Sequence, residues 1–209
     1  MGFINRAMWK SFSNITAGKY SEIQNYVPHP TDSQRKLFFF ADAAHIIKNL
    51  KSALINNKVI TLPEHFKKCY RLSLCAVLLS HLSELVDIQE KLHFKLAPTL
   101  NREILTVNRF NKMKVNKAVN LINRDVSSAL KLLGSDINKN EYQTTAIFIE
   151  IVSKWFALIV SRNPAMALGK SNNGESEKKF IEAIAFLKSV RDLFREIDIG
   201  EKKTLNQCK

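Results

Sequence analysis

A short apolar run at positions 37–41, Leu-Phe-Phe-Phe-Ala, constrains the fold of this chain most, because an acid and a helical pattern follow it directly. Five residues are too few for an ordinary helix, so the run predicts a buried strand. Asp42 would then stand at the carboxyl edge of that strand, where open α/β sheets place their chemistry. The helical pattern that continues to about position 56 carries three basic side chains, those of His45, Lys48 and Lys51.

The rest of the chain favours helices. Residues 59–63 form a short extended link that ends in a proline. Apolar residues then recur with helical periodicity over residues 64–86, 108–134, 141–162 and 176–197. Asn108 and Gly134 are expected to cap the second of these helices, whose opposite face carries Lys117, Arg124 and Lys131. The third is apolar nearly all round, as expected of a helix at the centre of a bundle.

The charge of the chain points to a polyanionic partner. Lysine and arginine number 32 against 19 acidic residues, which gives a net charge of +13. Such a balance favours nucleic acid, and a merely basic soluble surface is the alternative. The best apolar stretch, residues 146–160, is interrupted by Glu150 and Lys154 and is too short to span a bilayer, so no membrane partner is expected.

The three cysteines form no recognisable metal framework. Cys69, Cys75 and Cys208 contain no CxxC pair, and an odd, scattered set suits a reducing compartment. Cys69, Cys75 and His81 recur every six residues, which spreads them around a helix rather than gathering them as zinc ligands. Buried thiols are therefore expected at these cysteines.

A series of short motifs runs through the chain in a specific order. They are Met8-Trp9-Lys10, Pro28-His29-Pro30, Asp42 to Asn49, Phe94 to Pro98, Phe110 to Val115, and Trp155-Phe156 followed by Ser161-Arg162. In this order and spacing the chain resembles P element type DNA transposases, including relatives linked to THAP zinc-binding domains. In that family, a strand ending in Asp supplies the second of three metal-binding acids of an RNase H-like core, and a helical insertion that binds GTP follows.

The resemblance implies a mainly α fold in two parts. Residues 1–57 would be a small α/β remnant of the RNase H-like core, and residues 61–209 most of the helical GTP-binding insertion domain. Asp42 would be a catalytic, Mg2+-binding acid, with the other two acids outside this sequence. Two-metal phosphoryl transfer needs carboxylates from several places, so the chain is expected to be catalytically incomplete. Without the resemblance, Asp42 is read as a helix N-cap or a solvated acid.

The resemblance also assigns a nucleotide site. Lys114 and Val115 match the family's Lys-Val pair that contacts the nucleotide, and Phe156 matches an aromatic beside the guanine. Three positions depart from the pattern: Ala157 and Val160 replace an Asp and an Asn that read the base, and Thr99 replaces a Lys. GTP binding is therefore expected to be lost or weak. Substitution of the missing carboxylate by Glu141 or Glu150 is the rival interpretation.

Three functions remain open. The first is a fragment or domesticated remnant of a transposase that binds DNA or a protein partner, with His45, Lys48 and Lys51 facing DNA phosphate or, alternatively, forming a solvated helix face. The second is an active transposase whose missing acids come from a longer product or another chain. The third is a helical interaction module without a nucleic-acid role. The resemblance implies a nuclear protein, and a homo-oligomer is possible.

Overall fold

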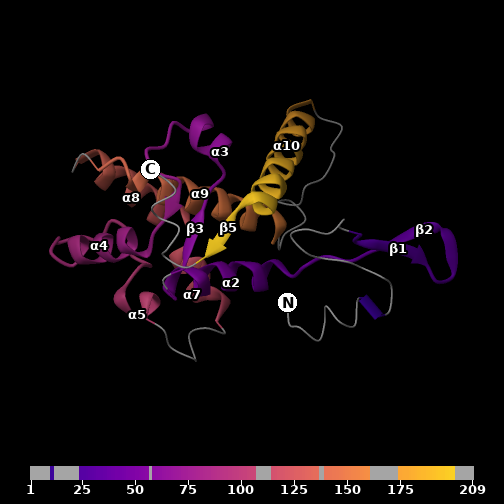
Figure 1. Cartoon of the computed structure of the whole chain (residues 1–209), viewed down its shortest axis with the longest axis horizontal. Helices are drawn as coiled ribbons and strands as arrows, with labels where there is room; N and C mark the ends of the chain where they lie inside the picture. Colours follow the sequence, from indigo (N-terminus) through magenta and orange to yellow (C-terminus); the bar gives the residue numbers. More distant parts are fainter. Residues whose placement is uncertain are drawn as a thin grey trace. The chain divides into compact units, whose positions relative to one another are not determined.

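The structure, a computed structural model, describes residues 10–11, 24–56, 58–106, 114–136, 139–160 and 174–200, the last segment with side chains from residue 177. The chain divides into two compact units, Met1–Ile46 and Ile47–Lys209. The division falls inside helix α2, Ala43–Ile55. The described elements are mostly helices with two small antiparallel sheets, so the prediction of a mainly α fold is confirmed (Figure 1).

The described part of the first unit is built around a β-hairpin. Strands β1, Tyr26–His29, and β2, Asp32–Phe38, pair in antiparallel fashion with Tyr26 opposite Phe38. Every residue of β2 is exposed, and Phe40 beyond it is 74 % exposed. The predicted buried strand over residues 37–41 is therefore wrong in both its end and its burial. The physical reason is that two strands without a second layer do not enclose an apolar face.

Asp42 begins helix α2 rather than ending a strand. Strand β2 stops at Phe38, and residues 39–42 have no regular secondary structure before the helix begins. The Asp42 Oδ1 atom accepts a hydrogen bond from the Ala44 amide at 2.9 Å, and its carbonyl accepts from the amides of His45 and Ile46. These are the bonds of a helix N-cap. The helix that was expected to run to about position 56 ends at Ile55.

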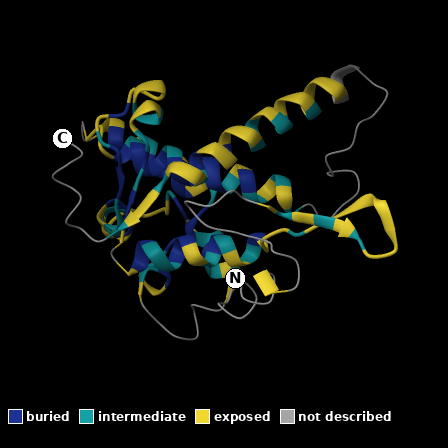
Figure 2. Ribbon diagram, turned by 45° about the vertical axis from the view of Figure 1, so that its right-hand side comes forward, coloured by how far each residue is buried: buried dark blue, intermediate teal, exposed yellow. Residues whose placement is uncertain are grey.

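The core of the second unit lies around helix α9, Tyr142–Ile159 (Figure 2). Helix α8, Arg124–Asp136, packs along it, and Ser127 Oγ donates a 2.8 Å hydrogen bond to the Ala146 carbonyl. Phe148 in the middle of α9 is fully buried. This placement confirms the expectation of a central helix. No helix among the described residues combines the length and apolarity that crossing a bilayer requires.

A three-stranded sheet joins segments far apart in the sequence. Its order is β4, Ala76–Val77, then β3, Val59–Thr61, then β5, Asp198–Gly200, and both pairings are antiparallel. Helix α10, Gly174–Glu196, leads into β5 (Figure 1). The extended link at 59–63 was predicted, whereas its two partner strands were not. Strands of two or three residues carry too little alternation to be recognised from sequence.

Two of the expected helices are broken. The segment 64–86 contains α3, Glu64–Cys69, then strand β4 and helix α4, Leu79–Gln89. The described part of 108–134 contains α7, Val115–Leu121, and α8, separated at residues 122–123. Asn123 causes the second break, because its Oδ1 accepts from the Val126 amide at 2.9 Å and starts a new helix. Asn108, the expected cap, lies outside the described residues.

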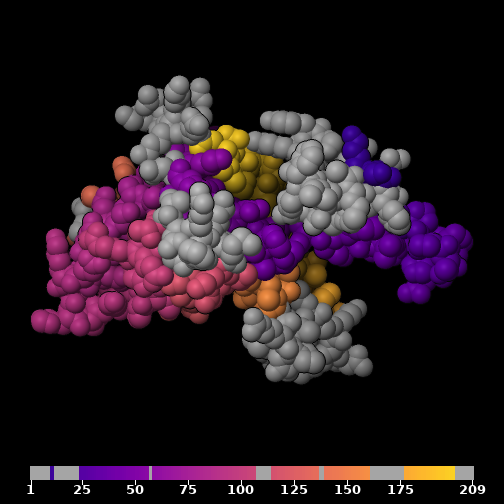
Figure 3. Space-filling view, turned by 90° about the horizontal axis from the view of Figure 1, so that it is seen from below, coloured from indigo at the N-terminus to yellow at the C-terminus, as the bar shows by residue number. Residues whose placement is uncertain are grey.

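The remaining short helix, α5, Arg102–Leu105, is capped by Asn101, whose side chain accepts a hydrogen bond from the Ile104 amide. Helix α5 contacts both α4 and α7, and in Figure 3 these helices share one continuous surface. The loop before α5 is fixed by Gln89, which is buried. Its side chain donates to the Leu100 carbonyl at 2.8 Å and accepts from the Ala97 amide at 3.2 Å.

Candidate functional site

Asp42 and His45 form a close pair at the start of α2. The Asp42 Oδ2 atom lies 2.5 Å from His45 Nδ1, and both side chains are about half exposed, at 59 % and 52 %. Both carboxylate oxygens therefore already bond within the chain. Within the described ranges, no three His, Cys, Asp or Glu side chains come together as a metal site. These residues do not by themselves fit a two-metal centre.

The basic residues of α2 do not share one surface. Lys48 is partly exposed, whereas Lys51 is buried at 2 % exposure. Burial lowers the pKa of Lys51, Lys117 lowers it further, and Glu103 raises it. Lys51 was expected to contact DNA phosphate with His45 and Lys48. Its burial removes it from that set, because an enclosed ammonium group cannot reach a backbone phosphate.

The basic face expected on the α7–α8 segment is largely neutralised. Lys117 Nζ lies 3.1 Å from the Glu103 carboxylate, and Lys131 Nζ lies 2.6 Å from Glu150. Arg124, the third cation of this face, is exposed at the start of α8. Two of the three charges are thus already paired with acids.

The residues assigned to the nucleotide lie on two helices. Lys114 is exposed and precedes α7 as its N-cap, and partly buried Val115 is the first residue of that helix. Phe156 is partly buried in the last turn of α9, with its ring centroid 6.3 Å from that of Trp155. No hydrogen bond or ring contact within the described segments joins Lys114 to Phe156. Within the described segments, these groups are therefore not in direct contact with one another.

The structure describes the surroundings of the three positions at which the sequence differs from the expected family pattern. Ala157 is exposed, and Val160 closes α9 by donating its amide to the Phe156 carbonyl at 2.9 Å. Thr99 Oγ1 donates to the Asn120 carbonyl at 3.1 Å and accepts from Asn123 Nδ2 at 2.8 Å. Thr99 thus braces the junction between α7 and α8, in the place where the family pattern has a cation.

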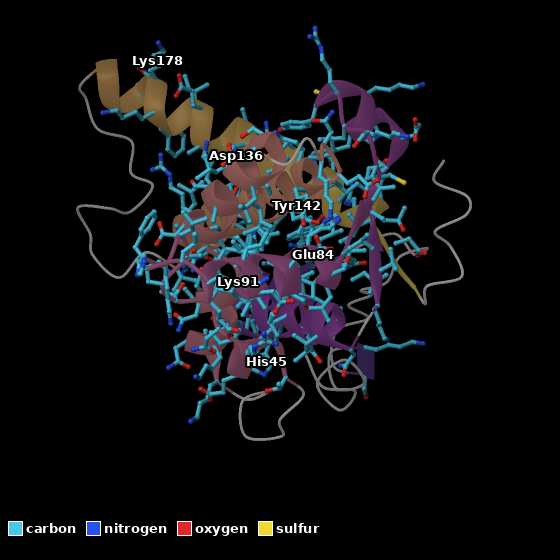
Figure 4. All side chains as sticks on the ribbon, turned by 90° about the vertical axis from the view of Figure 1, so that its left-hand side faces the viewer. His45, Glu84, Lys91, Asp136, Tyr142 and Lys178 are labelled. Carbon is cyan, nitrogen blue, oxygen red and sulfur yellow. The ribbon has the colours of Figure 1, made fainter. Side chains whose placement is uncertain are left out.

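Sequence reasoning missed a polar network that runs from the core to the surface of the second unit. His81 is buried, its Nδ1 lies 2.8 Å from Thr145 Oγ1, and its ring stacks on that of Tyr142 at 4.7 Å. Glu84 accepts from the Tyr142 hydroxyl and, at 3.0 Å, from Lys139 Nζ. Figure 4 shows Glu84 and Tyr142 lying close together. The sequence signal that could have revealed this network is the presence of polar residues inside apolar helical patterns.

The network shifts the acid–base behaviour of its members. Burial lowers the pKa of His81, so the ring is held neutral. The Tyr142 hydroxyl and then Lys139 hold the pKa of Glu84 below its ordinary value. Burial and the Glu84 carboxylate raise the pKa of Tyr142. The expectation of buried thiols is wrong at Cys69, which is exposed. Cys75 is buried but is disulfide-bonded, so it is not a free thiol either, and Cys208 lies outside the described residues.

Two hollows lie on the described surface of the second unit. The larger, about 440 Å³, is lined by Tyr70, Arg71, Leu72, Ser73, Asn140 and Gln143. The smaller, about 180 Å³, is lined by Ser83, Val86, Asp87, Arg102, Leu105 and Thr106. Neither includes Lys114, Val115 or Phe156. The larger hollow was not predicted, because its two walls are about 70 residues apart in the sequence.

Comparison with known proteins relates this architecture to transposases. Residues 44–172 match the family described as TNP-like, GTP-binding insertion domain. The Transposable element P transposase of Drosophila melanogaster is 26 % identical over 166 residues, which are 78 % of this chain and 19 % of that protein. The Drosophila P element transposase strand transfer complex matches with a TM-score of 0.64 and 16 % identity, over 99 % of this chain and 52 % of that one.

The matches cover most of this chain but only part of its relatives. The chain spans about a fifth of the length of its curated relative and about half of the solved chain. The structural likeness, at 16 % identity, establishes the fold over nearly the whole chain. The family match covers more than half of the 209 residues. This chain is a distant homologue of the Drosophila P element transposase and belongs to the TNP-like, GTP-binding insertion domain family.

Proposed function

We propose that this chain is a transposase-derived protein in which residues 1–57 are the edge of an RNase H-like core and residues 61–209 are most of an insertion domain. It binds DNA phosphate, and its GTP binding is weakened or lost. It acts in the nucleus and is catalytically incomplete by itself. The observation that carries the loss of GTP selectivity is the exposed Ala157 in the last turn of α9. The family pattern has a carboxylate at this position, beside the aromatic that Phe156 matches.

The chemistry of guanine makes this position decisive. Its Watson–Crick edge presents two donors that a carboxylate accepts together, and a methyl group accepts neither. An unpaired donor costs on the order of 1–3 kcal/mol when it is buried. Thr99 supplies no positive charge for a phosphate, and its hydroxyl already bonds to Asn120 and Asn123. Lys114 and Val115 therefore support at most a weak contact that does not distinguish the base.

Neither rival acid is well placed to replace the missing carboxylate. Glu141 precedes α9 and lies roughly 24 Å from Ala157 along the helix axis, at 1.5 Å per residue. Glu150 lies roughly 10 Å away on the same scale. Its carboxylate is also 2.6 Å from Lys131 Nζ. Neither acid is therefore expected to bind a base next to Phe156.

A calorimetric titration tests the nucleotide part of the proposal. The natural chain is titrated with magnesium GTP and magnesium ATP, beside a variant that combines Ala157→Asp with Val160→Asn. We expect no guanine preference in the natural chain and a gain of GTP binding in the variant. Guanine-selective binding by the natural chain at micromolar or tighter affinity contradicts the proposal.

The DNA part is tested by titrating a labelled duplex at several salt concentrations. Lys48→Met and Lys51→Met are a matched pair, since both remove one charge from α2 and only Lys48 reaches the surface. We expect Lys48→Met to reduce the slope of log affinity against log salt concentration by about one. Lys51→Met, measured on folded protein, should leave this slope unchanged. No duplex binding even at low salt would instead favour a helical interaction module without a nucleic-acid role.

A further inference from the structure

The larger hollow lies between the connection from α3 to β4 and the first turn of α9. We propose that it binds one unpaired nucleotide of single-stranded DNA, with Arg71 on the phosphate and the Tyr70 ring against the base. The inference rests on the proposed DNA binding and names a site and a strand form for it. The hollow is separate from the nucleotide positions above, since Gln143 and Phe156 lie roughly 20 Å apart along α9.

The backbone places Arg71 in a position that glycine normally occupies. Arg71 has a φ of 52°, in the left-handed region. Its amide bonds to the Lys68 carbonyl at 3.2 Å, and the Leu72 amide bonds to the Lys67 carbonyl at 2.9 Å. This is the Schellman arrangement that ends a helix, in which a side chain with a Cβ atom is unfavourable. A glycine would make the turn more easily, so an arginine at this position carries a conformational cost.

The charge around the hollow suits a phosphate. Lys67 and Lys68 occupy the last turn of α3, next to exposed Arg71. Glu150 is close enough to influence the Tyr70 phenol, and its carboxylate is paired with Lys131 at 2.6 Å. Three cations therefore lie within five residues of one another along this wall, and the acid that acts on Tyr70 is already paired with Lys131. A guanidinium group matches phosphate oxygens with two parallel hydrogen bonds, which a lysine does not provide.

The other lining groups suit a nucleobase. The Tyr70 ring is 46 % exposed and is held by Phe66, with ring centroids 4.4 Å apart. Asn140 and Gln143 offer side-chain amides, and Ser73 offers a hydroxyl, so both donors and acceptors are available to a base edge. Aromatic stacking beside a basic groove is how proteins hold unpaired bases. A volume of about 440 Å³ falls in the range of small-ligand sites.

The two walls are held in fixed positions. Thr144 Oγ1 donates a 2.6 Å hydrogen bond to the Leu74 carbonyl, which ties the first turn of α9 to the wall that contains Arg71. Leu72 is buried beneath that wall, and the Leu62 amide donates to the Cys75 carbonyl at 2.8 Å. The site is thus formed before a ligand arrives.

Fluorescence anisotropy tests the site, with a labelled oligothymidylate and a labelled hairpin duplex of equal charge. Arg71→Gly removes the guanidinium group and eases the turn, so this variant is expected to fold and to melt about 2–4 °C higher. We expect it to bind the single strand about tenfold more weakly. Duplex binding should change little. Lys188→Ala, an exposed site on α10, is the control for loss of one charge.

Tyr70→Leu keeps the apolar bulk and removes the ring, and we expect it to weaken oligothymidylate binding about fivefold or more. Equal single-strand affinity in the natural chain, Arg71→Gly and Lys188→Ala would overturn the site. If thymidine monophosphate displaces the labelled oligothymidylate as well as the unlabelled oligothymidylate does at the same nucleotide concentration, the site binds a free nucleotide rather than a DNA strand. A natural chain that binds neither DNA form would instead refute the proposed DNA binding itself.

Discussion

The apolar run at positions 37–41, which begins at the end of the β1–β2 hairpin, and helix α9 differ in burial. Phe40, just after the hairpin, is 74 % exposed, whereas Phe148 in α9 is fully buried. The hairpin strands pair along their backbones, and the tilted rings of Tyr26 and Phe38 lie with their centroids 5.7 Å apart. Yet it has no second layer within the described part of its unit.

Helix α9 differs in having neighbours on several sides. It packs against α8, α10 and strand β4. The Trp155 ring meets the edge of Phe194 at a centroid distance of 5.4 Å, and Lys154 lies over Phe186. An apolar run therefore indicates that a segment can be buried, and the elements that pack against the segment decide whether it is.

The largest expected effect separates these two phenylalanines. Phe148→Ala should reduce the free energy of unfolding by about 3–5 kcal/mol, because it leaves a cavity in the core of the second unit. Phe40→Ala removes the same atoms from an exposed position and should change it by less than about 0.5 kcal/mol. Urea denaturation followed by circular dichroism measures both. Similar losses from the two variants would break the comparison.

The polar network should give the next largest effect. Tyr142→Phe removes the hydroxyl that donates to Glu84, and we expect a loss of about 1.5–3 kcal/mol, typical of a hydrogen bond to a charged group. The pKa of Glu84 should rise toward its ordinary value, since this hydroxyl is the main cause of its depression. Denaturation and NMR titration of the carboxyl measure the two effects. Tyr26→Phe in the hairpin is the matched control.

A pH dependence should follow from His81. Its pKa is lowered by burial, so the unfolded chain takes up the proton first and stability falls as the pH drops below 6.5. Glu84 acts in the same direction only below about 4.5, where its carboxylate begins to be protonated in the unfolded chain. Denaturation between about pH 7 and pH 5 therefore isolates the histidine. His81→Gln should flatten this part of the profile, and an unchanged slope would exclude His81 as its source.

The smallest expected effect lies in the hairpin. Lys36 Nζ sits 4.3 Å from the centroid of the Tyr26 ring. Lys36→Met should weaken the hairpin by about 0.5 kcal/mol, the usual value for an exposed cation–π contact. Amide hydrogen exchange of Val27 and Leu37, which face each other across the strands, measures the local effect. A change in the unfolding of α9 would show that the hairpin and the core are more closely coupled than this comparison assumes.

Several features were within reach of sequence reasoning. The bounds of α9 and α10 follow from apolar periodicity to within a few residues, because each helix has one consistent pattern over many turns. The breaks within 64–86 and at Asn123 were missed. The apolar periodicity continues through both breaks. Strand β4 interrupts the first segment, and the hydrogen bond from the Val126 amide to Asn123 starts a new helix in the second. The alternative reading of Asp42 as an N-cap describes its hydrogen bonds correctly.

The helical class and the relationship to P element type transposases could be predicted from the sequence, because they depend on residue order and identity, and the resemblance supplied the expectation that Ala157 replaces a carboxylate. The burial of Lys51, the pairing of β5 with β3 and the hollow shared by Arg71 and Gln143 were established by the three-dimensional structure. The physical reason is that burial and long-range pairing depend on segments brought together from distant parts of the chain. Local periodicity shows which face of a segment is apolar and carries no record of what covers it.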